Sequence, residues 1–400
     1  MMDYTLFGES HGPVVGVLLR HVPAGLTVDK EFLRQQMARR QAQGELATMR
    51  HEADEVEFLS GVFEGKTTGE PLVAIIRNRE ARSGDYEALR TLVRPGHADF
   101  TAFCKSGGHN DYRGGGHFSG RLTAPLVAAG TLAKTWLKEQ NIIIKAQIID
   151  EINLRERAKD AKAAGDSVGG QILCTVSGLP AGIGGVDWYE AVESEMSRHI
   201  FAIPGVKAVA FGAGEDFAQM RGSRANDAFR TDGERIWTAS NHSGGINGGI
   251  TNGMDVTCTV TFRPTPSIAL AQETVDLSTM ENTTISVEGR HDPCIVLRAA
   301  PAVEAAAALA LCQLMESSGN DLPALRRQID EIDEELLALL EKRWEVARTI
   351  GAYKKKRGLP VLDEEREEQV LRSRGELLPQ YREAVEALWR EIMKWSREVQ

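Results

Sequence analysis

The sequence has 400 residues, of which 42% are hydrophobic and 26% are charged, and its formal net charge is −10. This length exceeds what one hydrophobic core normally organises and suits two domains, and the negative charge argues against a nucleic-acid-binding protein because nothing offsets phosphate repulsion. No apolar run reaches membrane-span length, no signal peptide is expected, and five scattered cysteines without a CxxC pair indicate a reduced cytoplasmic protein without a metal site.

The stretch Met1–Asn320 alternates predicted helices and strands. A helix begins near Asp29 and closes with paired arginines, and two further helices span Ala124–Gln140 and Val303–Met315. Asp255–Phe262 alternates apolar residues with threonines, which is the pattern of a strand with one buried face. Strands at hairpin spacing, mixed with helices, indicate an α+β architecture rather than a strict βαβ series.

Three glycine-rich stretches that contain histidines interrupt these elements: Phe7–Gly12, Arg94–Pro125 and Ser240–Cys294. Taken singly, glycine clusters are most often turns, and a lone histidine is more often structural than catalytic. A glycine-rich loop that leads into a helix can also hold a phosphate group through backbone N–H groups. The run Gly114–Gly116 lies ahead of a helix near Arg121, although it forms neither a Walker loop nor a dinucleotide fingerprint.

Together and in this order, the three stretches resemble chorismate synthase, and Asp54–Gly69 and Arg298–Ala306 agree with that family as well. The resemblance covers nearly all of Met1–Met315. It implies a β-α-β sandwich, a homotetramer and a requirement for reduced FMN, with NADPH as a candidate reductant. The implied reaction removes phosphate and a ring proton from 5-enolpyruvylshikimate 3-phosphate and gives chorismate, and a flavin can lend and recover the electron that this elimination needs.

The resemblance also implies roles for individual residues. His11, beside Ser10, would protonate the departing phosphate, and His97 would protonate the reduced flavin. Asp292 would lie near the flavin N5 and assist proton removal. The family's FMN-binding stretches match a further set: His117, Phe118, Ser119, Gly248, Arg263, Pro264, Thr265, Pro266, Ser267 and Arg290. The residues matched to substrate or nicotinamide nucleotide are Ser10, Arg39, Arg40 and Arg50.

Two departures from the family pattern affect these assignments. His117 and Phe118 stand where the family has an arginine and a serine, so we expect rearranged contacts to FMN. The Pro-Gly that usually follows the paired arginines is missing from RRQAQGELATMR. Its absence leaves open whether Arg39 or Arg40 is the matching residue.

The composition changes sharply near Asn320. The stretch Asp321–Gln400 is far richer in charged residues than Met1–Asn320 and far poorer in glycine. The junction SSGNDLP has the composition of a short connector. We therefore expect a first domain of residues 1–316, a linker of residues 317–321 and a second domain of residues 322–400.

The second domain has the pattern of three helices. The first carries an apolar stripe at three- and four-residue steps and ends at Gly358–Pro360. A shorter helix follows from about Asp363, and a third runs from about Pro379 to the end. Because three helices in about 80 residues make a thin core, we expect this domain to dimerise.

Three cations lie on or beside the apolar stripe of the long helix: Arg326, Arg343 and Lys354. One such cation is usually explained by its stem covering apolar surface while its head stays in water. Three along one stripe instead favour an external anion, because a desolvated cation is costly without a partner. The planar fork of arginine suits carboxylates, so the stripe indicates a small ligand with more than one carboxylate.

From Leu325 onward the sequence is similar to the all-helical family of chorismate mutases, which form intertwined dimers. The likeness lies in LRRQIDEIDEELLALLEKR, GAYKKKRGLPVLDEEREEQVL and ALWREIMKWSREVQ. It implies that Arg343 and Arg326 of the partner subunit bind the two carboxylates of chorismate, and that Lys354 meets the ether oxygen and a carboxylate. The other implied residues are Asp363 and Glu367 at the ring hydroxyl, Arg366 in the polar wall, and Ser396 and Gln400 on the far side, Gln400 donating to the ether oxygen.

The two resemblances predict consecutive enzymes in one chain, the first making chorismate and the second rearranging it to prephenate. The expected partners are these small molecules and further copies of the chain, in a tetramer whose mutase domains pair as dimers, and neither nucleic acid nor membrane. Two alternatives stay open. The helical tail could serve mainly as a regulatory ligand-binding module, or the chain could be a flavoprotein scaffold without activity.

Overall fold

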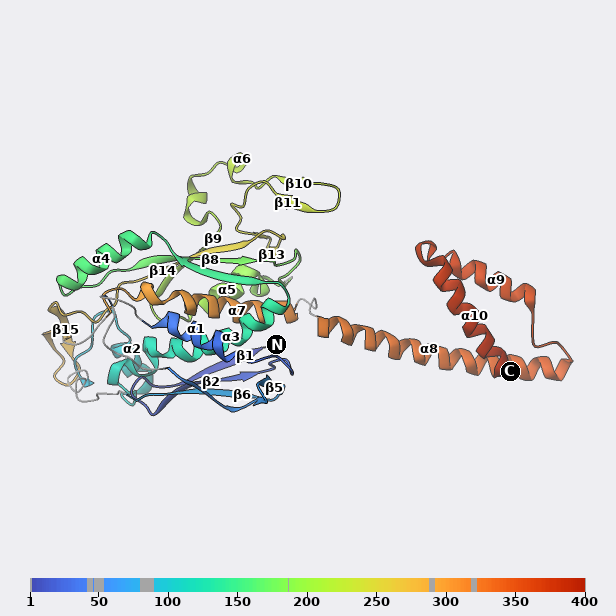
Figure 1. The fold of residues 1–400 in the computed structure, drawn as a ribbon, viewed down its shortest axis with the longest axis horizontal. Coiled ribbons are helices and arrows are strands. Elements are labelled where there is room, and N and C mark those ends of the chain that lie inside the picture. Colours follow the sequence, from blue (N-terminus) through green and yellow to red (C-terminus); the bar gives the residue numbers. More distant parts are fainter. Residues whose placement is uncertain are drawn as a thin grey trace. The chain divides into compact units, whose positions relative to one another are not determined.

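The computed structural model describes residues 2–41, 46, 54–79, 90–185, 187–287, 292–317 and 322–399, and gives only the backbone of residues 316, 317, 322–328 and 331. The chain forms two compact units, Met1–Asn320 and Asp321–Gln400 (Figure 1). Most of the predicted connector, residues 318–321, lies outside the described residues.

Unit 1 is built on two four-stranded antiparallel sheets, with strand orders β1-β2-β6-β3 and β7-β8-β14-β9. The first sheet comprises β1 (Asp3–Gly8), β2 (Val14–Arg20), β6 (Leu72–Arg77) and β3 (Val56–Ser60). The second comprises β7 (Ile143–Ile148), β8 (Gly170–Ser177), β14 (Val256–Phe262) and β9 (Val206–Phe211). Antiparallel sheets of this kind can bury one face each against a shared layer.

A layer of helices lies between the two sheets (Figure 1). It contains α1 (Lys30–Arg40), α3 (Thr123–Glu139), α5 (Val192–Phe201) and α7 (Ala300–Ser317). Residues 302–315 of α7 are almost all buried, so this helix is the centre of one continuous core. The predicted β-α-β sandwich is therefore confirmed.

Smaller elements surround the sandwich. The helices are α2 (Asp99–Ser106), α4 (Glu151–Ala163) and α6 (Gly222–Ala225), with short 3-10 segments at Arg113–Phe118, Gly120–Leu122, Trp188–Glu190, Gly214–Gln219 and Ile295–Arg298. The two-stranded hairpins are β4 (Val62–Phe63) with β5 (Lys66–Thr67), β10 (Phe229–Thr231) with β11 (Ile236–Thr238), β12 (Ile246–Asn247) with β13 (Ile250–Thr251), and β15 (Gln272–Asp276) with β16 (Glu281–Ile285).

Gly130 lets helices α3 and α7 approach closely. A Cβ atom added at Gly130 would lie 2.2 Å from the Cβ and 2.3 Å from the Cα of Ala305, and Ala305 itself is 1% exposed. Neither helix can shift to make room for a Cβ atom at Gly130. The atoms in contact include the backbone of α7, and the surrounding core is fully packed. The alanine-rich sequence of α7 and this glycine together set the spacing of the helical layer.

Substituting Gly130 with alanine is expected to destabilise the chain by about 1–3 kcal/mol, because overpacking outweighs the better helix propensity of alanine. The measurement is the urea midpoint of the intact chain. Gly222→Ala is the matched control, since a Cβ there meets no atom within 4 Å. An unchanged midpoint for Gly130→Ala would contradict the close approach of the helices.

Unit 2 consists of α8 (Leu322–Arg357), α9 (Glu364–Gly375) and α10 (Arg382–Glu398), with a short 3-10 turn at Pro379–Tyr381. Its few described buried side chains, Ala347, Ile392, Met393 and Ser396, lie on α8 and α10. Several apolar residues along α8 stay largely exposed in the single chain, including Ile332 at 61% and Leu339 at 63%. None of the helices in the described part of the chain is long and apolar enough to cross a membrane.

Candidate active sites

The described part of unit 1 contains a cavity of about 730 Å³, which is the larger of two neighbouring cavities that share Asp292 and Arg298. It brings together stretches that are far apart in the sequence, namely those around Ser10, His97, Gly114–Thr123, Phe201–Lys207 and Phe262–Ser267. Arg40 and side chains near the start of α7 complete its wall. All three glycine-rich stretches singled out in the sequence thus contribute residues to one site, the third through Arg263–Ser267 and Asp292.

The glycine run Gly114–Gly116 has positive φ throughout, which only glycine adopts readily. A Cβ atom on Gly114 would lie 2.3 Å from Cε1 of His11, and one on Gly115 would lie 2.8 Å from Cε1 of His97. The run is therefore thin enough for two imidazoles to pack against it. His11 is buried, at 6% exposure, and is not among the described residues that line the cavity, but its ring packs against Gly114, which does line it.

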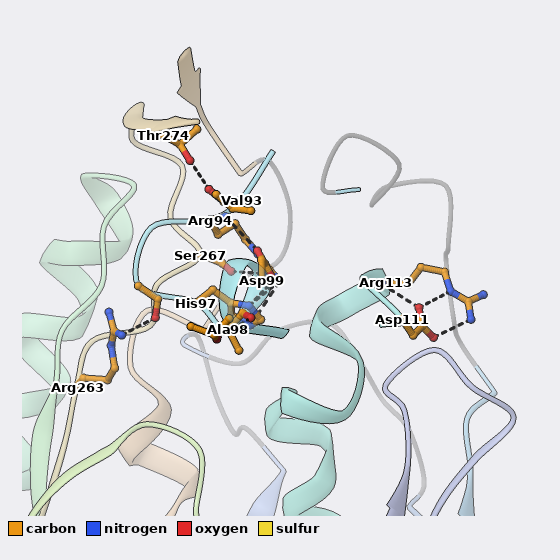
Figure 2. A network of polar contacts seen from close by, with 12 residues as sticks. Val93, Arg94, His97, Ala98, Asp99, Asp111, Arg113, Arg263, Ser267 and Thr274 are labelled. Carbon is orange, nitrogen blue, oxygen red and sulfur yellow. Dashed lines mark hydrogen bonds and ion pairs between the residues drawn. The ribbon is translucent and has the colours of Figure 1, made fainter. Parts of the chain in front are cut away.

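His97 belongs to a buried polar network (Figure 2). Its Nδ1 lies 2.5 Å from Oδ1 of Asp99, and Arg94 donates to both oxygens of the same carboxylate at 2.8 Å. Arg94 also donates to Oγ of Ser267 at 3.0 Å. Burial opposes ionisation of Asp99, but Arg94 and His97 outweigh it and hold the pKa of Asp99 well below its usual range.

A second charged cluster joins Arg40, Asp54 and Arg121. Both guanidinium groups form ion pairs with the Asp54 carboxylate, and all three side chains are buried. Arg40 lines the larger cavity, and its Nε is buried without a partner among the described residues. Arg39 points elsewhere and pairs with Glu304 at 2.8 Å. Of the two arginines that the sequence left open, Arg40 is therefore the one at this cavity.

Replacing Asp54 with asparagine is expected to destabilise the chain by about 3–5 kcal/mol at neutral pH, because it leaves two buried cations without a countercharge. Burial alone would raise the pKa of Asp54, and the two arginines outweigh burial and lower it. A lowered pKa in the folded state stabilises the fold above the unfolded-state value and loses this effect as pH falls through the folded-state value. The difference from wild type in unfolding free energy, measured by urea titration, should therefore shrink below about pH 4.

The residues matched to FMN can be tested for fit. His117, Phe118, Ser119 and Arg263–Ser267 all line the larger cavity. The Oγ1 atom of Thr265 is buried there without a hydrogen-bond partner among the described residues. A buried hydroxyl group of this kind is available to form a hydrogen bond with a polar ligand. His117 donates from Nδ1 to the Gly8 carbonyl at 3.0 Å, and Phe118 is 46% exposed. This part of the chain fits a flat polar cofactor.

Of the other predicted residues, Asp292 lines the cavity, and the rest lie apart from it or outside the described residues. Gly248 lies in the turn between β12 and β13 and is not among the described residues that line the cavity. Asp292 forms an ion pair with Arg298, and both side chains line the larger cavity and a second one of about 410 Å³. The residues outside the description are Arg50, Arg290, Gln400 and the side chain of Arg326.

In unit 2, Arg343 on α8 donates to the Ser396 hydroxyl on α10. No described carboxylate lies within ion-pair distance of Arg343, whereas burial and then the nearby charge of Arg374 lower the pKa of Arg343. A partly dehydrated cation next to another cation is stabilised when an external anion binds and neutralises the charge. Lys354 donates to the Val361 carbonyl at 2.7 Å, so it is held close to the chain that leads into α9.

The predicted residues of α9 lie at its N-terminal end. Asp363 caps the helix by accepting from the backbone N–H of Arg366 at 3.0 Å, and the Arg366 side chain donates to Gln369 at 2.6 Å. Glu367 forms an ion pair with Arg397 of α10. Arg343, through Ser396, and Glu367, through Arg397, thus contact the same turn of α10. The site of unit 2 is organised around the C-terminal end of that helix.

Sequence reasoning missed three residues of these sites. Asp99 stands two positions after His97 in RPGHADF, and Asp54 opens the stretch DEVEFLS, so both lie within motifs but were not assigned a role. Arg397 directly follows Ser396. An acidic residue close to an assigned histidine was the one signal that could have identified Asp99.

Comparisons with known proteins agree with this geometry. A family model described as chorismate synthase matches residues 2–315, and one described as chorismate mutase type II matches residues 325–400. Chorismate synthase of Thermococcus kodakarensis is 42% identical over 337 residues, which cover 78% of this chain and 95% of the relative. Chorismate synthase of Chitinophaga pinensis is 45% identical over 313 residues, which cover 78% and 93%.

A crystal structure of chorismate synthase has the same fold, with a TM-score of 0.62 at 23% identity, covering 84% of this chain and 98% of that one. The chain belongs to the chorismate synthase family over residues 2–315 and carries a chorismate mutase type II domain over residues 325–400, so that a lyase domain and an isomerase domain are both present.

Proposed function

We propose that the chain converts 5-enolpyruvylshikimate 3-phosphate to chorismate in unit 1 and rearranges chorismate to prephenate in unit 2. The observation that carries the first step is the larger cavity, whose wall holds His97, Arg40, Asp292 and the Arg263–Ser267 stretch, with His11 directly behind Gly114. The wall thus combines cations, a carboxylate and buried polar groups without hydrogen-bond partners among the described residues, namely Arg40 Nε and Thr265 Oγ1. This combination suits a substrate with several negative charges beside a polar cofactor.

The elimination breaks the bond from the ring carbon to the phosphate oxygen and removes a ring proton. His117, Ser119 and Arg263–Ser267 would hold reduced FMN, which would supply a transient electron to assist this redox-neutral elimination. The chain supplies the binding and the protons. Arg40 would bind an anionic group of the substrate, His11 would donate a proton to the departing phosphate, and Asp292 would assist removal of the ring proton. His97 would carry the proton that is donated to the reduced flavin.

The rearrangement in unit 2 needs no nucleophile, base or metal, but a folded substrate and donors at the breaking ether bond. Arg343 would bind one carboxylate, and Arg326 of the partner subunit the other. Lys354 would leave the Val361 carbonyl for the ether oxygen, with Gln400 as the second donor there. Asp363 and Glu367 would bind the ring hydroxyl, Arg366 would close the polar wall, and Ser396 would line the far side.

In the test, the intact chain is incubated with 5-enolpyruvylshikimate 3-phosphate and reduced FMN under anaerobic conditions. The products are followed by liquid chromatography. Formation of prephenate supports both activities. Chorismate without prephenate would make the helical unit a regulatory module, which a direct mutase assay with added chorismate would settle. Recovery of unreacted substrate, with FMN bound, would overturn the first activity.

We further propose a homotetramer in the cytoplasm whose mutase units pair as dimers. The exposed apolar residues along α8 support pairing, since a stripe of this size is normally covered. Light scattering on the intact chain measures the assembly. An anaerobic assay of FMN reduction by NADPH decides whether the chain reduces its own cofactor.

A further inference from the structure

The contacts of His97 define which ring nitrogen can exchange a proton with a ligand. Its Nδ1 lies 2.5 Å from Oδ1 of Asp99, and an ionised carboxylate only accepts hydrogen bonds. The proton of this bond therefore belongs to Nδ1. Nη2 of Arg94 also lies 3.0 Å from Nδ1 and 3.4 Å from Nε2, but an arginine only donates, and this Nη2 donates to Oδ1 of Asp99 at 2.8 Å. The other nitrogen, Nε2, lies against Gly115, where an added Cβ would approach it to 3.0 Å. His97 also lines both the 730 Å³ cavity and a neighbouring one of about 200 Å³.

Asp99 is itself held from two sides. It is the first residue of α2, it accepts the backbone N–H of Arg94 at 3.0 Å, and it receives two bonds from the Arg94 guanidinium. Arg94 and Asp99 are 5% and 8% exposed. A buried carboxylate with four donors around it has little freedom to rotate, so it fixes the plane of the imidazole as well as its tautomer.

The same network reaches the stretch matched to the flavin. Arg94 donates to Oγ of Ser267, and Nη1 of Arg263 donates to the Gly96 carbonyl at 2.5 Å (Figure 2). Two bonds thus connect the loop that carries His97 with Arg263–Ser267 in the wall of the cavity. The imidazole is positioned relative to that wall, and not merely within its own loop.

We infer that Asp99, clamped by Arg94, is a positioning residue that keeps the Nδ1 of His97 protonated and leaves Nε2 as the nitrogen that exchanges a proton with the ligand in the cavity. The inference rests on the proposed synthase function for its consequence in turnover. The arrangement of the imidazole can be measured without turnover.

Asp99→Asn is the principal test. Asparagine has nearly the same shape, but Arg94 would draw its oxygen and leave its N–H₂ group facing His97, which favours the tautomer with the proton on Nε2. Diethyl pyrocarbonate acylates only a ring nitrogen with a free lone pair. We expect carbethoxylation of His97, followed by peptide mass analysis, to slow by about tenfold or more, while His117 reacts as in wild type. Synthase turnover is expected to fall by about 10- to 100-fold, with the affinity for FMN, measured by fluorescence titration, changed less than about twofold.

A double-mutant cycle separates positioning from general stability. If Asp99 acts through His97, then Asp99→Asn should have little further effect on turnover in a His97→Ala background. An equal loss in both backgrounds would overturn the inference. Should Asp99→Asn fail to fold by circular dichroism, Arg94→Lys, which keeps the charge but loses a bond to Asp99, is expected to slow His97 carbethoxylation to a smaller extent.

Glu195→Gln is the matched control. Glu195 accepts bonds from Arg198 and from Nε2 of His199, which is the same combination of carboxylate, arginine and imidazole, but on α5 and outside the lining of the larger cavity. Its substitution should leave synthase turnover and His97 reactivity unchanged. If wild type makes no chorismate, the proposed function fails, and the carbethoxylation rates still test the positioning. If Asp99→Asn keeps both wild-type turnover and wild-type His97 reactivity, the positioning role fails alone.

Discussion

Replacing Arg343 with alanine is expected to lower mutase turnover by about 100- to 1000-fold and to leave synthase turnover unchanged. The described structure gives Arg343 a neutral partner, Ser396, and a nearby cation, Arg374, so its charge is free to meet a substrate carboxylate. The rearrangement depends on binding the substrate in a folded conformation, and no catalytic nucleophile or base can compensate for the loss of that binding. The measurements are the disappearance of added chorismate for unit 2 and phosphate release from 5-enolpyruvylshikimate 3-phosphate for unit 1, both on the intact chain.

Two variants sharpen this prediction. Arg343→Lys keeps the charge but loses the planar fork, so its turnover should lie between those of wild type and the alanine variant. Arg372→Ala removes an arginine that is 73% exposed and paired with Glu368, and it should leave mutase turnover unchanged. An equal loss of both activities in Arg343→Ala would contradict two separate sites.

The fold was predictable wherever local chemistry decides it. Asp29 caps α1, the predicted strand alternates buried and half-buried residues through β14, and α8 ends directly before Gly358 as expected. The predicted start of α7 at Val303 was three residues late. The helix begins at Ala300, because proline is tolerated in a first turn and Pro301 therefore does not delay it.

The long-range partners could not be read from the sequence. Arg39 and Arg40 are neighbours at the end of one helix, yet Arg39 pairs with Glu304, 265 residues away, and Arg40 pairs with Asp54, which precedes β3. Successive helical residues point about 100° apart, so two arginines of equal chemistry enter different surroundings. The same holds for Gly130, whose importance depends on Ala305 of α7, a helix far from Gly130 in the sequence but packed directly against it.

The candidate site of unit 1 was predicted by its motifs but not by its supporting contacts. His11, His97 and Arg263 stand in stretches that the family resemblance singles out, and the structure gathers those stretches around one cavity. Asp99 was not assigned a role, because two residues that stand two positions apart in the sequence need not face each other. Only the fold shows that its carboxylate faces the imidazole two residues earlier in the chain.

Replacing His11 with asparagine is expected to lower synthase turnover by about 100- to 10,000-fold while FMN affinity and mutase turnover stay unchanged. An asparagine side chain is polar and fits a similar volume, but at neutral pH it cannot give a proton to a departing phosphate. His11 is buried behind Gly114, so the substitution removes the proton source without opening the cavity to solvent. Turnover is measured as phosphate release, and FMN affinity by fluorescence titration.

His21→Asn is the control, because His21 is exposed, stands outside both candidate sites and has a φ of 58°, a conformation that asparagine accepts. It should turn over as wild type does. Phosphate release at the wild-type rate in His11→Asn would show that another group protonates the leaving phosphate. Weakened FMN binding in the same variant would instead make His11 part of the cofactor site, since the glycine run that it packs against also carries His117 and Phe118 into the cavity wall.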